Sequence, residues 1–208
     1  MVGELKSPEE LLKERFERVE KAIGLGEPDK VPLIIFTCGD VLRKYATGYE
    51  LYFNYDRARE ASVKFVTEYP VDVFLAALAA EGFIFALAFS NYPDIAPSIR
   101  FWTGPMHDAL GDKYTKWPGR ELPEDSVLQF IGGQFMDVKE YNKLSDDPVT
   151  FVNEVIFPRA CVNLEKTGSS KANAALIRLG FEASRYLRFL GESAADLAKV
   201  GIPSLPLT

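Results

Sequence analysis

Two short apolar segments separated by a helical one constrain the fold more than any other feature of this chain. The first, Val31 to Phe36 (VPLIIF), resembles a strand that is buried on both faces. The second, Val71 to Ala76 (VDVFLA), is predicted to be another strand. Between them, Asp56 to Tyr69 has the apolar spacing of a helix. A strand, a crossover helix and a second strand favour a right-handed parallel βαβ unit. The sequence therefore predicts an α/β fold.

Local signals predict the remaining elements. Ser7, Pro8 and Glu10 form a helix start with a capping box, and the helix is expected to end between Gly24 and Pro28. Its apolar stripe consists of Leu11, Leu12, Phe16, Val19 and Ile23. The further expected elements are a short strand at Ile99 to Thr103, a loop with one helical turn at Gly104 to Gly119, and helices at Val138 to Leu144, Pro148 to Val155 with Asp147 as N-cap, Ser170 to Leu190, and Glu192 to Val200 before Gly201. No repeat or linker interrupts this order, so we expect one globular unit.

The composition disfavours some classes of binding partner and indicates the cellular compartment. The net charge is −6 and the isoelectric point is near 5.0, which disfavours nucleic acid and anionic membranes as partners. Cys38 and Cys161 lie far apart without metal-ligand spacing, so the sequence predicts neither a disulfide framework nor a zinc site. The charged N-terminus lacks the apolar core of a signal peptide, and no apolar run reaches the ~18 residues of a membrane span. We therefore expect a cytoplasmic protein.

The segment from Trp117 to Arg159 carries the most specific pattern. Its part before Asp137 is long, rich in Gly and Pro, and aromatic enough to predict an ordered loop. Its WPG, LP-x-D, QF-x-x-G-x-[FY]-M, EY-x-x-L-x-x-DP and PR motifs resemble the uroporphyrinogen decarboxylase superfamily, in particular the branch of corrinoid-dependent methyltransferases. GEPDKVPL at Gly26 to Leu33 and LAKVGIPSL at Leu197 to Leu205 are also similar to that family.

This resemblance implies a (β/α)8 barrel, a fold that normally needs ~250 residues. The chain has 208 residues, so we expect residues 1–208 to be the N-terminal part of such a barrel. For complete relatives, the resemblance implies methyl transfer from a small methylated substrate to a corrinoid protein. Those relatives bind zinc through a His-x-Cys pair and a distant Cys in their second half, and these ligands are absent from this chain. We expect no cofactor bound by this chain alone.

The residues after the first strand are candidates for substrate contacts, because function in α/β folds concentrates at the carboxyl ends of strands. They are Cys38, Asp40 and Arg43. Asp40 is a candidate catalytic carboxylate, with the alternative that it caps the helix that follows. The decarboxylases carry an arginine-rich motif here, whereas this chain reads FTCGDVLRKYATG. Porphyrinogen decarboxylation is therefore the less favoured activity.

Glu81 is the other candidate catalytic residue. It is the only charge in an apolar run, where burial would raise its pKa and make it a proton donor. The alternative is a partly exposed helical position. Tyr92, in a turn, and His107, the only histidine, are candidate substrate-binding residues. A lone histidine in a loop is more often a hydrogen-bonded structural residue than a catalytic base.

Gln134 and Met136 complete the candidate substrate-binding set. They belong to a Gly-Gly-Gln-Phe-Met stretch where similar proteins often have Gly-Glu-[FY]-Met. The glutamine keeps hydrogen bonding but removes the charge. The alternative is a tight turn packed under Phe135 and Met136.

Two functional hypotheses remain. In the first, the chain belongs to a methyltransferase-type barrel whose remaining strands and metal ligands lie on another polypeptide or are missing from this sequence. In the second, it is a non-catalytic half-barrel that binds a ligand or a partner chain. A half-barrel exposes strand edges and apolar faces, so both hypotheses predict association with a second copy or a complementary chain.

Overall fold

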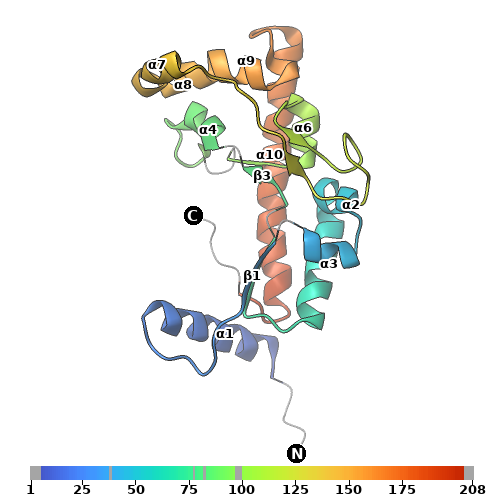
Figure 1. The fold of residues 1–208 in the computed structure, drawn as a ribbon. Helices are drawn as coiled ribbons and strands as arrows, with labels where there is room; N and C mark the ends of the chain where they lie inside the picture. Colours follow the sequence, from blue (N-terminus) through green and yellow to red (C-terminus); the bar gives the residue numbers. More distant parts are fainter. Residues whose placement is uncertain (1–5, 38, 77, 82, 97–99, 204–208) are drawn as a thin grey trace, which may run out of the picture. The chain divides into compact units, whose positions relative to one another are not determined.

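The protein is a mixed α/β chain that divides into two compact units. The computed structural model (Figure 1) describes residues 6–37, 39–76, 78–81, 83–96 and 100–203, without the side chains of residues 81 and 83. Unit 1 comprises Met1–Leu78 and Arg188–Thr208, and unit 2 comprises Ala79–Leu187. Each unit contains its own buried core and is described separately.

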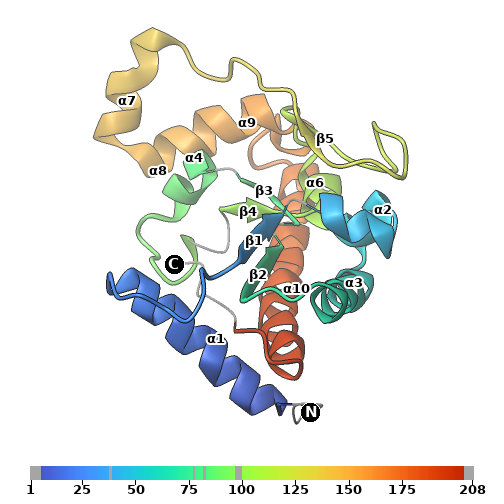
Figure 2. The same ribbon diagram turned by 60° about the horizontal axis from the view of Figure 1, so that its bottom comes forward.

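Unit 1 contains the βαβ arrangement that the sequence predicts. Its elements in chain order are α1 (Pro8–Ile23), β1 (Ile34–Thr37), the 3-10 helix η1 (Asp40–Lys44), α2 (Gly48–Phe53), α3 (Tyr55–Glu68), β2 (Val73–Ala76) and the last residues of α10 (Ser170–Ala198). Strands β1 and β2 are parallel, with Ile34 opposite Val73 and Thr37 opposite Ala76 (Figure 2). The predicted parallel pair and the helix between its strands are confirmed.

The start of α1 also agrees with the prediction. The Ser7 side chain accepts a hydrogen bond from the Glu10 backbone N–H at 3.2 Å, and the Glu10 side chain accepts one from the Ser7 N–H at 2.8 Å. These reciprocal bonds satisfy two donors that a helix start otherwise leaves free. The apolar stripe is only partly buried, because Val19 is enclosed whereas Phe16 and Ile23 are exposed.

A buried arginine joins α1 to the strands. The Arg18 side chain is only 2% exposed, and it donates hydrogen bonds to Glu14, Asp29 and Asp72. The second oxygen of Asp72 accepts from the Leu33 backbone N–H at 2.8 Å, just before β1. Arg18 therefore fixes α1 to the amino ends of both β1 and β2.

Strand β1 differs from the expectation of burial on both faces. Ile34 is 45% exposed and Phe36 is 62% exposed, whereas Val73 and Phe74 of β2 are buried. A continuous apolar run is typical of a strand covered on both sides. Ile34 and Phe36 alternate along β1 and share one face, so this face is open to solvent in the described part of the chain.

Unit 2 is built from short elements around an aromatic core. They are β3 (Ala80–Glu81), α4 (Phe83–Ala86), η2 (Leu87–Phe89), β4 (Phe101–Trp102), α6 (Gly104–Leu110), β5 (Thr115–Lys116), β6 (Gln129–Phe130), η3 (Val138–Glu140), α7 (Tyr141–Asp146), α8 (Pro148–Phe151), the π-helical η4 (Val152–Ile156), α9 (Phe157–Ala160), η5 (Val162–Leu164) and the first part of α10. Two antiparallel pairs, β3–β4 and β5–β6, are its described sheets. The predicted helix start at Asp147 is confirmed, since its side chain accepts from Thr150 N–H.

The segment Gly104 to Gly119, predicted to be a loop with one helical turn, contains a longer helix than expected in its first half. Residues Gly104–Leu110 form helix α6, with Pro105 in its first turn and Gly111 (φ +64°) after its end. Almost every residue of α6 is buried. Burial stabilises this helix despite its short length, a tertiary effect that local sequence does not reveal.

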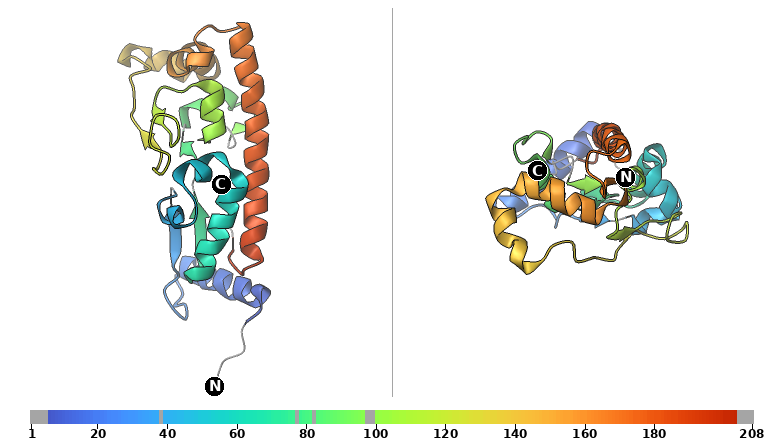
Figure 3. Two further views of the ribbon diagram at one scale, coloured as in Figure 1. Left: turned by 90° about the vertical axis from the view of Figure 1, so that its right-hand side faces the viewer. Right: turned by 90° about the horizontal axis from the view of Figure 1, so that it is seen from above.

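The two helices expected near the C-terminus are one helix. Helix α10 runs without a break through Gly191 (Figure 3). A single helical glycine costs only about 1 kcal/mol relative to alanine, which tertiary packing easily offsets. The predicted end is confirmed at Gly201, where φ is +76° and the following Ile202 N–H donates back to Leu197.

Candidate functional site

The carboxyl end of β1 in unit 1 carries three of the predicted site positions. Asp40 is exposed and begins η1, and Arg43 lies one turn further along the same 3-10 helix and is also exposed. Cys38 lies outside the described residues. The N-cap of η1 is Gly39, so the alternative that Asp40 caps this helix is wrong.

Gly39 shapes this strand end. Its φ of +101° belongs to the left-handed region that favours glycine, and a Cβ there would lie 3.2 Å from Leu78 and 3.3 Å from the Tyr52 hydroxyl. The Gly39 N–H also donates to the Thr37 hydroxyl at 3.1 Å. This tight turn presents Asp40 to solvent directly after the strand, as a substrate contact would require.

The other predicted positions lie in unit 2 and have separate surroundings. The backbone of Glu81 pairs with Phe101 in the β3–β4 ladder, so its helical alternative is wrong, and its side chain is not among the described ones. Tyr92 is 57% exposed. Whether Glu81 donates a proton stays a prediction.

The Gln134 stretch is an irregular segment in which Gly132 adopts a φ of +70° and the chain bends at Met136. A Cβ on Gly133 would lie 2.4 Å from the Phe135 ring, so that ring packs directly over the glycine. The Gln134 amide donates to Asp137 at 3.3 Å, and Met136 is half-buried. The Arg159 side chain connects this segment to η3, because it donates to the Phe135 carbonyl at 3.1 Å and to the Glu140 carboxylate. Substrate binding by Gln134 and Met136 stays a prediction.

His107 is at the centre of the most connected polar cluster in unit 2. It lies in α6 rather than in the expected loop, and it is 6% exposed. Its Nδ1 lies 2.5 Å from Asp112 Oδ1, and its Nε2 lies 3.3 Å from Glu121 Oε1. The second Asp112 oxygen accepts from the Thr115 N–H at 3.0 Å and from the Thr115 hydroxyl. Both ring nitrogens thus face carboxylates.

Trp117 extends this cluster. Its indole N–H donates to the Thr115 hydroxyl at 2.8 Å, and its backbone N–H donates to Glu121 at 2.9 Å. Its ring lies 5.7 Å from the His107 imidazole, and the side chain is fully buried. The buried Trp117 explains why the long connection after it is ordered, whereas Phe130 and Ile131 are exposed and contribute little to its burial.

The electrostatics of the cluster favour a charged imidazole. Burial disfavours the imidazolium and is the largest single effect, but the hydrogen bonds and charges of Asp112 and Glu121 together outweigh it and raise the pKa of His107 above 6.5. For Glu121, burial again acts against the charged form. The Trp117 N–H and the His107 charge nevertheless lower the pKa of this carboxyl. The raised pKa of His107 and the lowered pKa of Glu121 therefore both favour an ion pair in mild acid.

An aromatic core lies beside the cluster. Phe85 stacks on Trp102 at 4.2 Å and on Phe157 at 5.1 Å, and Tyr114 packs against the first two rings. The Tyr114 hydroxyl is buried without a hydrogen-bond partner among the described residues, and burial raises its pKa strongly. Burial also raises the pKa of the Cys161 thiol, which makes this cysteine a poor nucleophile.

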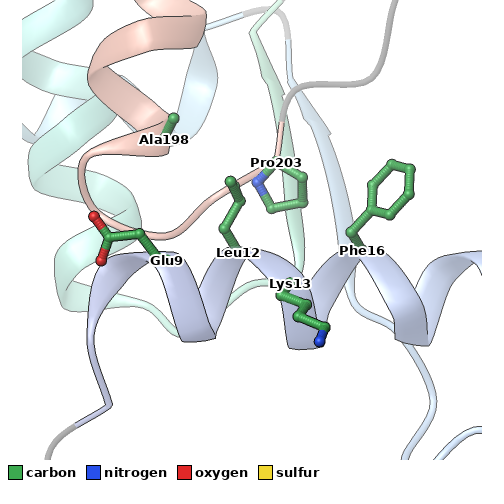
Figure 4. A pocket seen from close by; sticks show the side chains of 6 residues that line it. All are labelled: Glu9, Leu12, Lys13, Phe16, Ala198 and Pro203. Atoms are coloured by element: carbon green, nitrogen blue, oxygen red, sulfur yellow. The ribbon is translucent and has the colours of Figure 1, made fainter.

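The two described grooves are in unit 1. One, of about 410 Å³, is lined by α1, the end of α10 and Pro203. Leu12 and Phe16 lie on the side of α1 that faces Pro203 (Figure 4). The other, of about 530 Å³, lies on α3 around Arg59. Neither includes a predicted site residue. Arg59 is occupied by ion pairs with Asp196, Glu192 and Asp56.

The described residues contain no group of three His, Cys, Asp or Glu side chains with metal-binding geometry. In the same residues, no helix has both the length and the apolar character that crossing a membrane requires.

Sequence reasoning missed Asp112, Thr115 and Glu121 as partners of His107. One local signal was present: His107 precedes Gly111, a helix-ending residue, so Asp112 follows the helix end closely enough to fold back onto the imidazole. Arg18 was missed as well, although it lies seven residues after Leu11, on the apolar stripe of α1. Glu121 had no such signal, because its contact depends on the return of the loop.

In comparisons with protein-family models, curated proteins and solved structures, no match was found for this chain.

Proposed function

We propose that this chain is the N-terminal part of a uroporphyrinogen decarboxylase-like barrel and takes part in methyl transfer from a small methylated substrate to a corrinoid protein. The observation that carries the proposal is the parallel β1–β2 pair. It occurs where the resemblance places the first barrel strands, and a parallel pair with a helical crossover is the repeating unit of such a barrel.

The exposure of β1 supports the barrel part of the proposal. Parallel sheets are normally covered on both faces, yet Ile34 and Phe36 are open to solvent on one face of β1. In the proposed barrel, further strands continue the sheet and cover these side chains.

The chemistry assigned to the chain is limited to its own residues. Asp40 and Arg43, exposed after β1, bind the polar end of the substrate. A reduced corrinoid carried by the partner protein would supply the acceptor for the methyl group. The bond between the methyl carbon and its oxygen, nitrogen or sulfur breaks, and the leaving atom keeps the electron pair. Glu81 donates the proton that neutralises the leaving group. No step is assigned to zinc.

The test measures both the oligomeric state of the chain and its methyl-transfer activity. The purified chain is analysed by light scattering after size exclusion, and is then mixed with reduced free cobalamin and separate panels of methyl ethers, methylamines and methyl thioethers. Formation of methylcobalamin is followed by absorbance. We expect an assembly larger than the monomer and turnover with one class of compound, with loss of turnover in Asp40→Asn and Glu81→Gln. Lys64→Gln, on α3, is the control variant.

The other outcomes are also informative. A defined assembly that methylates no cobalamin, alone or with added zinc, would favour a non-catalytic half-barrel subunit, which the open face of β1 also supports. Release of carbon dioxide from uroporphyrinogen would indicate a decarboxylase. A stable monomer without any turnover would contradict the proposal as a whole.

A further inference from the structure

A second feature, independent of the proposed reaction, connects α6 with the turn formed by residues 117–122. Within this turn, the N–H groups of Arg120 and Leu122 donate to the Trp117 carbonyl, and Gly119 adopts a φ of +70°. Two neighbouring residues of α6 contact two neighbouring residues of the turn. Asp108 pairs with Arg120 through two hydrogen bonds of 2.8 and 2.7 Å, and His107 pairs with Glu121.

The His107 contact differs from the Asp108 contact because it needs a proton. An imidazolium donates from both nitrogens, so it can bind Asp112 and Glu121 together. A neutral imidazole has one N–H. The shorter contact, at 2.5 Å, joins Nδ1 to Asp112, whose other oxygen is held by Thr115, so the remaining proton stays on Nδ1. The Nε2 lone pair then faces the Glu121 carboxylate, which is also an acceptor.

We propose that the 117–122 turn is a proton-operated latch, in which the His107 imidazolium ties Glu121 to Asp112 and loss of its proton releases Glu121 and loosens the turn around Trp117.

The surroundings of His107 favour this assignment. Among the other charged groups on the neighbouring elements, Asp108 pairs with Arg120 and Lys113 pairs with Glu165, and Lys116 lies on β5 beside Thr115. Glu121 is 43% exposed, so water can solvate its carboxylate after release, whereas Asp112 is almost fully buried and keeps its partners. Loss of the His107 proton therefore breaks the contact with Glu121 in the 117–122 turn and leaves the contact with Asp112 intact.

The sign of the pH dependence follows from the direction of the pKa shift. The pKa of His107 in the folded chain is raised above its ordinary value of 6.5. The stabilisation by the imidazolium is thus fully present below pH 6.5 and is lost as the pH rises through the folded-state pKa. The latch is closed in mild acid and opens as the pH rises through the folded-state pKa of His107.

The chain offers clean reporters for a test. It contains one histidine, so a ¹³C-histidine NMR spectrum gives the titration of His107 without assignment. It contains two tryptophans, and Trp102→Phe leaves Trp117 as the single indole reporter. We expect the Trp117 emission to change with the same midpoint as the His107 resonance, and that midpoint to lie above pH 6.5.

Variants separate the latch from a merely structural histidine. In Glu121→Gln, the His107 midpoint falls and the Trp117 emission no longer follows it. In His107→Gln, the emission change between about pH 6 and 9 is lost. Glu124→Gln, the same substitution at an exposed position in the connection that follows, serves as the matched control and leaves both midpoints unchanged. A Trp117 emission that stays constant while His107 titrates would overturn the latch, as would a midpoint at or below 6.5 in the unmodified chain.

Discussion

At the scale of single residues, Arg18 makes the sharpest prediction. Its side chain and that of Asp72 are both buried, and removal of the arginine leaves the Asp72 charge without its main partner in the interior. Breaking a buried ion pair in this way typically costs about 3–5 kcal/mol. We expect Arg18→Met to lower the free energy of unfolding of unit 1 by about 3 kcal/mol, measured by urea denaturation followed by circular dichroism.

Lys13 provides the matched control on the same helix. Its ammonium group lies 3.8 Å from Glu17, and both side chains are largely exposed. Exposed pairs contribute about 0–1 kcal/mol, so Lys13→Met is expected to have almost no effect on stability. Equal effects of the two variants would show that the Arg18 network does not stabilise the fold.

The same network predicts an acid dependence. Hydrogen bonds from Arg18 lower the pKa of Asp29 to about 2 from an ordinary value of 3.8. A carboxylate with a lowered pKa stabilises the fold above its unfolded-state value, and this contribution is lost as the pH falls through the folded-state pKa. Between about pH 4 and 2, the unmodified chain should therefore lose more stability than Arg18→Met does, as measured by urea unfolding at each pH.

At the scale of elements, the sequence predicts what local chemistry determines. The start of α1 follows from Ser7, Pro8 and Glu10 alone, and the parallel β1–β2 pair follows from two apolar runs around a helix. The sequence does not predict the full length of α6, which burial stabilises, nor the exposed face of β1. For the same reason, only one of the two carboxylate partners of His107 could have been predicted from local sequence. Asp112 is close in sequence, whereas Glu121 reaches the imidazole only after the loop has folded.

Because α10 is continuous through Gly191, we can predict the effect of replacing this glycine on stability. Gly191 is exposed, and a Cβ built there meets no atom within 4 Å. Gly191→Ala is therefore expected to raise the melting temperature, because alanine is more favourable in a helix by about 0.5–1 kcal/mol. If the helix were broken at this glycine, as the sequence suggested, alanine would instead destabilise the chain.

Gly201 is the contrasting position just beyond the same helix. Its φ is +76°, and a Cβ there would lie 2.6 Å from the Leu11 Cβ and 3.0 Å from the Pro8 carbonyl oxygen. Gly201→Ala should therefore lower the melting temperature measured in the same experiment, through backbone strain and the displacement of α1. A gain in stability at Gly201 would contradict the close approach of the chain that the structure describes here.

At the scale of the whole molecule, the division into two units determines how the chain should unfold. Each unit has its own buried core, and Trp102 and Trp117 both belong to unit 2. Tryptophan emission therefore reports on unit 2, whereas circular dichroism reports on helices of both units. Because Arg18 lies in unit 1, Arg18→Met is expected to shift an early part of the dichroism transition and to leave the emission midpoint unchanged. Helix α10 has residues in both units, and it is the element that could couple the two cores. If it does, both midpoints will fall together, and the chain will behave as one cooperative unit despite its two cores.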